Sequence, residues 1–357
     1  MWNKATNNLK IPSELTVQPS SPTPLFTVTP AGAMKTASQE FVVFQGNLPV
    51  RGDPPPVKTK TATDFLSEIC KPGGPVEEAL NYLKAIGILP ATTNLASFQN
   101  KLHDIWFTPY YKKKTKLWHN GFEHTFVGDK VLSIKDYKGF HNWYQFLIEQ
   151  ASGGITNVPT SFSKPIQFLV ATKPPYMSCL TFKWGIATKA SRQGSSLFVG
   201  TSPAFEIALF SACFLQYPGD QCSCTIGTSS VTVQTYTSPP SVPPVTAVAT
   251  AYPSEVSNLA GGRCDGIAKQ YRTDCGWIGI SKNECNDRCC CWKEEPGTYD
   301  TPWPWCFYPE GHRCQGIAQD DRKECGYLGI QRDECERKNC CFDSHVPGVT
   351  FCFKGRY

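Results

Sequence analysis

The spacing of apolar residues predicts helices early in the chain. Phe98, Leu102 and Ile105 recur at helical spacing, and residues 75–80 form another helical pattern with a proline in its first turn. A further helix is expected from residue 63 onward. Residues 1–60 are rich in Pro, Ser, Thr and Val, so they predict extended or irregular backbone rather than helix.

From about Phe122 onward, short apolar runs alternate with glycines and turns, which predicts strands. Helical patterns interrupt the runs at residues 142–150 and 204–213, the second with Ser202 suited to cap the helix and Pro203 suited to its first position. Helices followed by strands predict one α+β unit. The predicted strands contain residues 126–127, 131–134, 168–171, 196–199 and 231–233.

An internal repeat follows a plausible linker at residues 254–262. Five cysteines each recur 50 positions later, and the residues around them are similar, as in Arg263-Cys264-Asp265-Gly266 and Arg313-Cys314-Gln315-Gly316. Each copy has roughly 45 residues, which is too few for a stable apolar core without covalent staples. The repeating cysteines are Cys264, Cys275, Cys285, Cys290 and Cys291, followed by Cys314, Cys325, Cys335, Cys340 and Cys341.

Cysteine usage predicts a disulfide framework formed in an oxidising compartment. Of 18 cysteines, thirteen lie between Cys264 and Cys352. Zinc is the alternative, but no two cysteines are separated by two residues, the spacing of a common zinc knuckle. Cys70, Cys179, Cys213, Cys222, Cys224 and Cys289 cannot be paired from the sequence.

We expect a secreted, monomeric protein, although the export signal is not visible. Residues 1–10 contain no apolar core of a signal peptide, so we expect a chain truncated at its start. No apolar stretch is long enough for a membrane span. The net charge of +5 permits nucleic-acid binding without indicating it.

Two histidines stand in distinctive surroundings, each shortly after a Gly-Phe pair: His124 and His141. RNA is cut when its 2′-hydroxyl attacks the adjacent phosphorus, which needs a base for the hydroxyl proton and an acid for the departing 5′-oxygen. Imidazoles can serve in both roles near neutral pH, and a cation beside the phosphorus stabilises the developing charge. Zinc ligation or a structural role fits two histidines equally well at this point.

Both histidine motifs, residues 121–129 and 139–146, resemble the EndoU family of poly(U)-specific endoribonucleases. The resemblance extends to Thr181-Phe182-Lys183-Trp184, to residues 198–209 and to Thr250-Ala251-Tyr252-Pro253, and it covers roughly residues 20–255. It implies an α+β fold in which a helical N-terminal lobe is combined with antiparallel sheets. It also implies cleavage of uridine-rich single-stranded RNA at uridylates, leaving a 2′,3′-cyclic phosphate.

The same resemblance implies roles for individual residues. His124 is the expected general acid, His141 the general base and Lys189 the group that stabilises the phosphorane, with Lys183 as a competitor for the last role. Thr250, Tyr252 and Trp143 are expected to bind substrate, Tyr252 by stacking on the base. Many family members need or prefer manganese (Mn²⁺), for which Glu123 and Asp129 are the candidate ligands.

The two repeats resemble trefoil (P-type) domains, because Cys-x10-Cys-x9-Cys-x4-Cys-Cys is followed by an aromatic residue and a last cysteine in both. Some trefoils bind mucin glycans through an Asp and a Trp. Asp321 matches that Asp in the second copy and Trp305 that Trp in the first, so neither copy has the full pair. The family's connectivity implies Cys264–Cys291, Cys275–Cys290, Cys285–Cys306, Cys314–Cys341, Cys325–Cys340 and Cys335–Cys352.

We therefore expect an irregular segment at residues 1–19, an endoribonuclease domain at 20–255, a linker at 256–262 and trefoils at 263–309 and 312–355, the trefoils holding the enzyme to mucin glycans or a surface. The rival function is a catalytically inactive EndoU scaffold that acts as a secreted binding or lectin-like protein. The basic run at residues 112–116 is either an RNA-steering element or a solvated loop. Arg51-Gly52-Asp53 spells an integrin-type tripeptide of undecided function.

Overall fold

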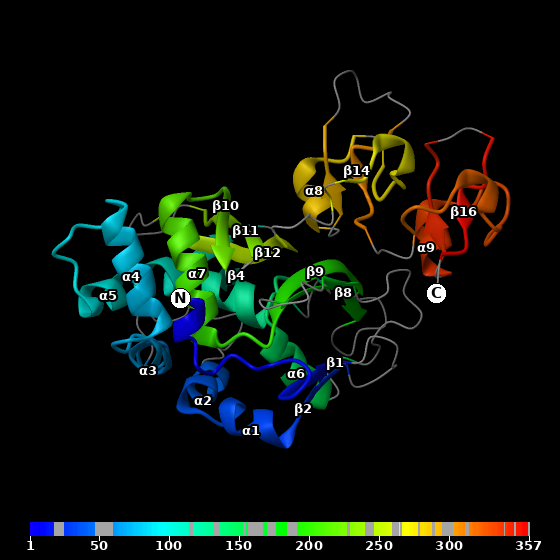
Figure 1. The fold of residues 1–357 in the computed structure, drawn as a ribbon. Coiled ribbons are helices and arrows are strands. Elements are labelled where there is room, and N and C mark those ends of the chain that lie inside the picture. Colours follow the sequence, from blue (N-terminus) through cyan, green and yellow to red (C-terminus); the bar gives the residue numbers. More distant parts are fainter. Residues whose placement is uncertain are drawn as a thin grey trace.

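Helices build the first part of the N-terminal domain, here residues 1–258 (Figure 1). The three helices expected between residues 63 and 106 are confirmed, and Asn94 caps the last by accepting the Ser97 N–H at 2.8 Å. The expectation of no helix before residue 60 is wrong, because Thr29 caps a short helix and the next one buries Phe41 and Phe44. The helices are α1 (Pro30–Thr36), α2 (Gln39–Gly46), α3 (Lys60–Ile69), α4 (Pro75–Ala85) and α5 (Leu95–Phe107), after a 3₁₀ turn η1 (Trp2–Lys4).

The structure is a computed structural model that describes residues 1–17, 25–46, 60–113, 117–131, 136–152, 155, 167–169, 176–183, 191–226, 229–239, 246–258, 264, 266–277, 279–287, 290–294, 303–310, 314–338, 340–345 and 348–355. Arg51-Gly52-Asp53 lies outside these residues. In the part of the chain so described, no helix is long and apolar enough to cross a membrane.

Small antiparallel sheets dominate the rest of the N-terminal domain, as expected, with helices between some of their strands. Among the described strands, two sheets have three strands, in the orders β7-β8-β9 and β10-β11-β12, and the others are two-stranded. The strands are β1 (Leu15–Val17), β2 (Phe26–Val28), β3 (Tyr110–Lys112), β4 (Leu117–His119), β5 (Asp129–Val131), β6 (Asp136–Lys138), β7 (Gln167–Leu169), β8 (Tyr176–Lys183), β9 (Ser191–Val199), β10 (Gln221–Ile226), β11 (Ser229–Thr237) and β12 (Val248–Asn258).

Helix α7 (Pro203–Gln216) is buried along most of its length and organises the core. Ser202 caps it by accepting the Phe205 N–H, and Pro203 occupies its first turn, as the sequence predicts. The indole N–H of Trp106 in α5 donates to Ser211 Oγ of α7 at 2.8 Å, which ties the helical lobe to the sheets. Helix α6 (Trp143–Ala151) also lies among the strands, and Asn142 caps it.

Two local expectations are wrong. Phe126 and Val127 do not form a strand; residues Glu123–Val127 form a π-helical turn, η2, whose Phe126 ring is buried. Strand β12 runs to Asn258 because its residues pair with β11, so the expected linker begins later than residue 254.

Each trefoil module is held by three disulfides, and all six have the connectivity that the resemblance implied. A seventh, Cys213–Cys222, joins α7 to β10 within the N-terminal domain, and Cys70 and Cys224 are free thiols. The module elements are η3 (Lys269–Tyr271), α8 (Lys282–Asp287), β13 (Cys291–Trp292), β14 (Cys306–Phe307), η4 (Gln319–Asp321), α9 (Arg332–Arg337), β15 (Cys341–Phe342) and β16 (Cys352–Phe353).

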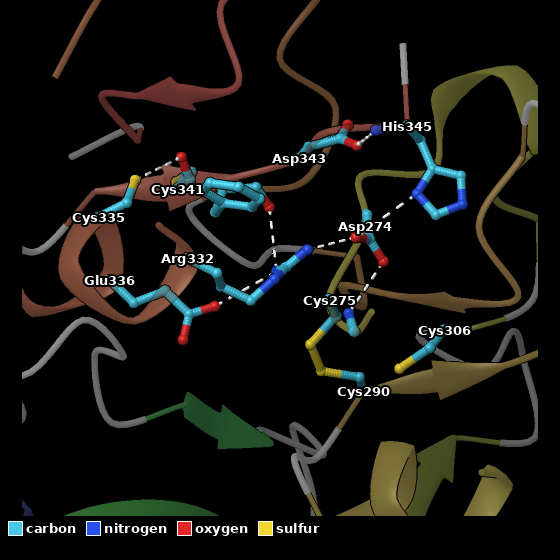
Figure 2. A network of polar contacts seen from close by, with 12 residues as sticks. Asp274, Cys275, Cys290, Cys306, Arg332, Cys335, Glu336, Cys341, Asp343 and His345 are labelled. Atoms are coloured by element: carbon cyan, nitrogen blue, oxygen red, sulfur yellow. Dashed lines mark hydrogen bonds and ion pairs between the residues drawn. A yellow bond between two sulfur atoms is a disulfide. The ribbon is translucent and has the colours of Figure 1, made fainter. Parts of the chain in front are cut away.

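Polar contacts join the two modules (Figure 2). Arg332 of the second module donates from Nη2 to Asp274 Oδ2 of the first, and its Nη1 lies 3.4 Å from Glu336 Oε1. His345 Nδ1 lies 3.5 Å from the same Asp274 oxygen. Since Asp274 and Arg332 are largely buried, an unpaired charge at this junction would be costly.

Candidate active site

Backbone hydrogen bonds hold the two histidine motifs side by side. The Phe140 N–H donates to the His124 carbonyl oxygen at 2.9 Å, and the His141 N–H donates to the Thr125 carbonyl oxygen at 2.6 Å. The π-helical turn presents His124, and such turns occur frequently at functional sites. The motifs are 17 positions apart in the sequence, but these bonds place their backbones in direct contact.

Unusual backbone at residues 139–140 makes this approach feasible. Gly139 has φ +75°, and a Cβ there would lie 1.8 Å from the His124 carbonyl oxygen, so only glycine fits. Phe140 also has a positive φ, 74°, which costs free energy in a bulky residue and is found mainly where a site requires it. The Gly-Phe pair before His141 therefore has a structural explanation.

Strand β12 packs against the first histidine motif. A Cβ at Gly121 would lie 2.3 Å from the Val248 carbonyl oxygen, so glycine permits this strand to lie against the first histidine motif. The Ala251 N–H donates to Thr125 Oγ1 at 3.1 Å. These contacts bring the segment with Thr250 and Tyr252 to the histidine motifs.

His141 is buried, and its Nδ1 lies 2.9 Å from the Ser196 carbonyl oxygen. Because a carbonyl oxygen only accepts, Nδ1 has the proton, and Nε2 is the basic nitrogen of the neutral ring. The ring stacks on Tyr252 with centroids 4.6 Å apart and planes at 19°. Ser195 Oγ, which donates to the Phe140 carbonyl at 2.7 Å, supports the same turn.

His124 is half-buried, and its Nδ1 has a different kind of neighbour. Lys112 Nζ, at the end of β3, lies 3.2 Å from it. A lysine ammonium only donates, so Nδ1 of His124 accepts and its ring proton lies on Nε2. The two histidines therefore adopt opposite tautomers.

A buried carboxyl group lies behind His141. Glu206 Oε1 accepts from Thr201 Oγ1 at 2.5 Å and Oε2 from Asn142 Nδ2 at 3.2 Å. Burial raises the pKa of Glu206, and the two hydrogen bonds lower it by less, so that the pKa is about 8. The group joins α7 to the residue that follows His141, so it supports the turn on which that histidine stands.

Several residues expected in the site are packed differently from that expectation or lie outside the described residues. Trp143, expected to bind substrate, is fully buried, and its indole N–H donates to the Thr201 carbonyl at 2.7 Å, so its ring is packed in the core of this structure. Lys189 lies outside the described residues, as does the Lys183 side chain. Tyr252 is 5% exposed and stacks on His141, so in this arrangement its face is not open to an RNA base. Thr250 Oγ1 is buried without a hydrogen-bond partner among the described residues.

Only one of the two expected manganese ligands has a described side chain. Glu123 is buried, and the Asp129 side chain is outside the described residues. Within the described part of the chain, groups of three metal-ligating side chains occur only in the trefoil modules. Two of these consist of disulfide cysteines, and the third, Asp274, Asp343 and His345, already pairs with Arg332 and Arg322.

The two glycan candidates belong to different modules. Trp305 packs edge-on against Trp292 in the first, with ring centroids 5.9 Å apart, whereas Asp321 is exposed in the η4 turn of the second.

Lys112 lies beside His124, although the sequence indicated only that it belongs to a basic run. The alternation of β3 was an available signal, since it puts Lys112 on the same face as the buried Tyr110.

Comparison with known proteins identifies both parts of the chain. The family model for endoribonuclease XendoU matches residues 17–253, and the trefoil (P-type) model matches residues 264–309 and 314–355. The solved structure titled "The structure of XendoU: a splicing independent snoRNA processing endoribonuclease" covers 71% of this chain and 93% of its own, with a TM-score of 0.53 and 20% sequence identity. That likeness concerns the fold alone.

Curated relatives match shorter segments. A uridylate-specific endoribonuclease of Paralichthys olivaceus is 37% identical over 147 residues, which are 40% of this chain and 35% of the relative. Uridylate-specific endoribonuclease C of Xenopus laevis is 29% identical over 205 residues, 57% of this chain and 59% of the relative. The match thus spans only about a third of the first relative's length. Since the family model covers more than half of the residues and the fold agrees with it, the chain belongs to the XendoU endoribonuclease family and has two trefoil domains after the family domain.

Proposed function

We propose that this protein is a secreted endoribonuclease that cuts single-stranded RNA at uridylates by 2′-hydroxyl transesterification. The observation that carries the proposal is that Nδ1 of His141 lies beside the Ser196 carbonyl oxygen, whereas Nδ1 of the adjoining His124 lies beside the Lys112 ammonium. In the neutral rings this leaves Nε2 of His141 as the basic nitrogen and Nε2 of His124 as the protonated one. An acid and a base are the two groups that the reaction requires.

In this scheme His141 Nε2 takes the proton from the 2′-hydroxyl, whose oxygen then attacks the adjacent phosphorus. The bond to the 5′-oxygen breaks, His124 Nε2–H gives its proton to that oxygen, and a 2′,3′-cyclic phosphate remains. Lys189 is proposed to stabilise the phosphorane charge, by family resemblance. Stacking on Tyr252 and the hydrogen bond to the Ser196 carbonyl orient the imidazole of His141, the general base.

Uracil recognition is assigned to Thr250. Its buried hydroxyl lacks a hydrogen-bond partner among the described residues, and leaving such a group unpaired costs about 1–3 kcal/mol. A uracil edge offers both a donor and an acceptor to this hydroxyl. Binding of uridine would therefore satisfy a group that folding leaves unpaired.

The experiment is cleavage of a short oligonucleotide with one uridine among adenosines, followed by analysis of the product ends. Wild type is expected to cut at the uridine, and His141→Ala to lower kcat by about 10²–10⁴-fold. His345→Ala, in the second trefoil, is the matched control and should leave cleavage unchanged. Absence of cutting by the folded, disulfide-intact wild type would favour a binding scaffold instead.

Manganese belongs to the proposal only through family resemblance. Among the described residues, no three metal-ligating side chains lie close together at the histidine centre, and the steps above use only the chain's own groups. The same assay with Mn²⁺ and with a chelator measures whether the metal is required.

Secretion and mucin association complete the proposal. Six trefoil disulfides support an oxidising compartment, since such bonds are rare in the cytosol. Retention of the full chain on immobilised mucin, and its release by free glycan, would test the proposed trefoil partner. Retention that free glycan does not reverse would count against it.

A further inference from the structure

The hairpin β3–β4 places one lysine of the basic run against the histidine centre. Tyr110 is buried and Tyr111 is 43% exposed, as expected for alternating positions of a strand. Lys112 follows on the buried side, with Nζ 5.7 Å from the Tyr110 ring centroid and 3.2 Å from His124 Nδ1. Lys113 is exposed. Two adjacent lysines of one run therefore have different surroundings.

The Lys112 contact has a chemical consequence for an acid step. His124 accepts on Nδ1, so the ring is neutral and has its proton on Nε2. A neutral imidazole that gives up this proton becomes an unfavourable anion unless a proton reaches Nδ1 at the same time. Lys112 Nζ lies 3.2 Å from Nδ1, and its ammonium has a proton to give.

We propose that Lys112 is a positioning residue for the acid step, an inference that rests on the proposed endoribonuclease function. It holds His124 in the Nε2–H tautomer. As the bond between phosphorus and the 5′-oxygen breaks, the Nε2 proton passes to that oxygen and a Lys112 proton passes to Nδ1. The ring stays neutral, Lys112 becomes an amine, and a proton from water restores it.

A change of leaving group tests this inference. Two oligonucleotides are compared that differ in one atom, an oxygen or a sulfur at the 5′ position that departs from the uridine phosphate. A thiolate leaves without protonation, since thiol pKa values lie near 8.5, far below those of alcohols. A group that acts only through the acid step therefore matters for the oxygen substrate and not for the sulfur substrate.

Lys112→Ala is expected to lower kcat on the oxygen substrate by about 10²-fold or more, with KM nearly unchanged, and to leave the sulfur substrate within about threefold. Lys112→Arg keeps the charge and the donors but does not release a proton, so it should also stay slow on the oxygen substrate. The matched control Lys113→Ala should leave both rates unchanged. His141→Ala should slow both substrates.

Each variant is judged by the ratio of its two rates, so a partial loss of folded protein cancels. Equal losses of Lys112→Ala on both substrates would overturn the inference, because the lysine would then act on the phosphate or on the fold. Full activity of Lys112→Arg on the oxygen substrate would overturn the proton transfer. If wild type cuts neither substrate, the endoribonuclease proposal itself fails, which is a separate result.

Discussion

The N-terminal domain and the trefoil modules are stabilised by different interactions. The domain buries a continuous apolar cluster rich in aromatic rings, such as Trp106, Phe122 and Phe126, and has one described disulfide. The modules have small buried clusters made largely of cysteines, with three disulfides each. A module of roughly 45 residues cannot bury enough apolar surface, so covalent links replace the core.

The buried polar groups of the N-terminal domain and of the trefoil modules also have different kinds of partner. In the domain, buried polar groups such as Glu206 and His141 are held by neutral partners next to the histidine centre. Between the modules, the buried groups are an ion pair, Asp274 with Arg332. The proposed catalytic centre thus lies in the part that depends least on disulfides, so we expect the two parts to respond separately to perturbation.

The largest expected effect is that of a reductant. Reduction of the full chain should unfold both modules, because a disulfide that closes a loop of about 15 residues contributes roughly 3 kcal/mol and each module has three. The N-terminal domain should keep its fold and its cleavage activity. Hydrogen exchange followed by mass spectrometry, mapped onto the two regions before and after reduction, measures this. Equal loss of protection in both regions would contradict the comparison.

The second prediction perturbs the apolar core instead. Trp106→Ala removes a fully buried indole and its hydrogen bond to Ser211, so the domain should lose about 3–5 kcal/mol while exchange in the modules is unchanged. Trp118→Ala is the matched control, since that residue is 36% exposed, and should cost clearly less than Trp106→Ala. Urea unfolding monitored region by region distinguishes the two.

The smallest expected effect concerns pH at the module junction. Burial lowers the pKa of His345, but the hydrogen bond and charge of Asp274, together with Asp343, outweigh it and raise the pKa above 6.5. Arg332 opposes this. Protonated His345 therefore stabilises the modules below about pH 6.5, and this stabilisation is lost as pH rises through the raised pKa.

Exchange protection at the junction should accordingly be higher at pH 5.5 than at pH 8 after correction for the intrinsic exchange rate, by about 1 kcal/mol or less. His345→Asn should remove the difference, with the N-terminal domain as an internal reference. A variant that keeps the pH difference would show that another group is responsible.

Local sequence signals predicted a large part of this fold. The spacing of Phe98, Leu102 and Ile105 predicted α5, and Ser202-Pro203 predicted the start of α7, because caps and apolar periodicity are encoded within a few residues. The errors occurred where distant contacts override local preference. The π-helical turn at His124 is one example, since residues 139–141 and β12 pack against it.

The cysteine repeat and the two histidine motifs could be read from the sequence alone, because each is a local pattern of residue types. Only the tertiary structure decided that a carbonyl lies at one histidine Nδ1 and a lysine ammonium at the other, and that Cys213 pairs with Cys222. The physical reason is that a tautomer depends on the direction and chemistry of a neighbour brought from elsewhere in the chain. Residue order specifies the side chains, and folding decides which of them meet.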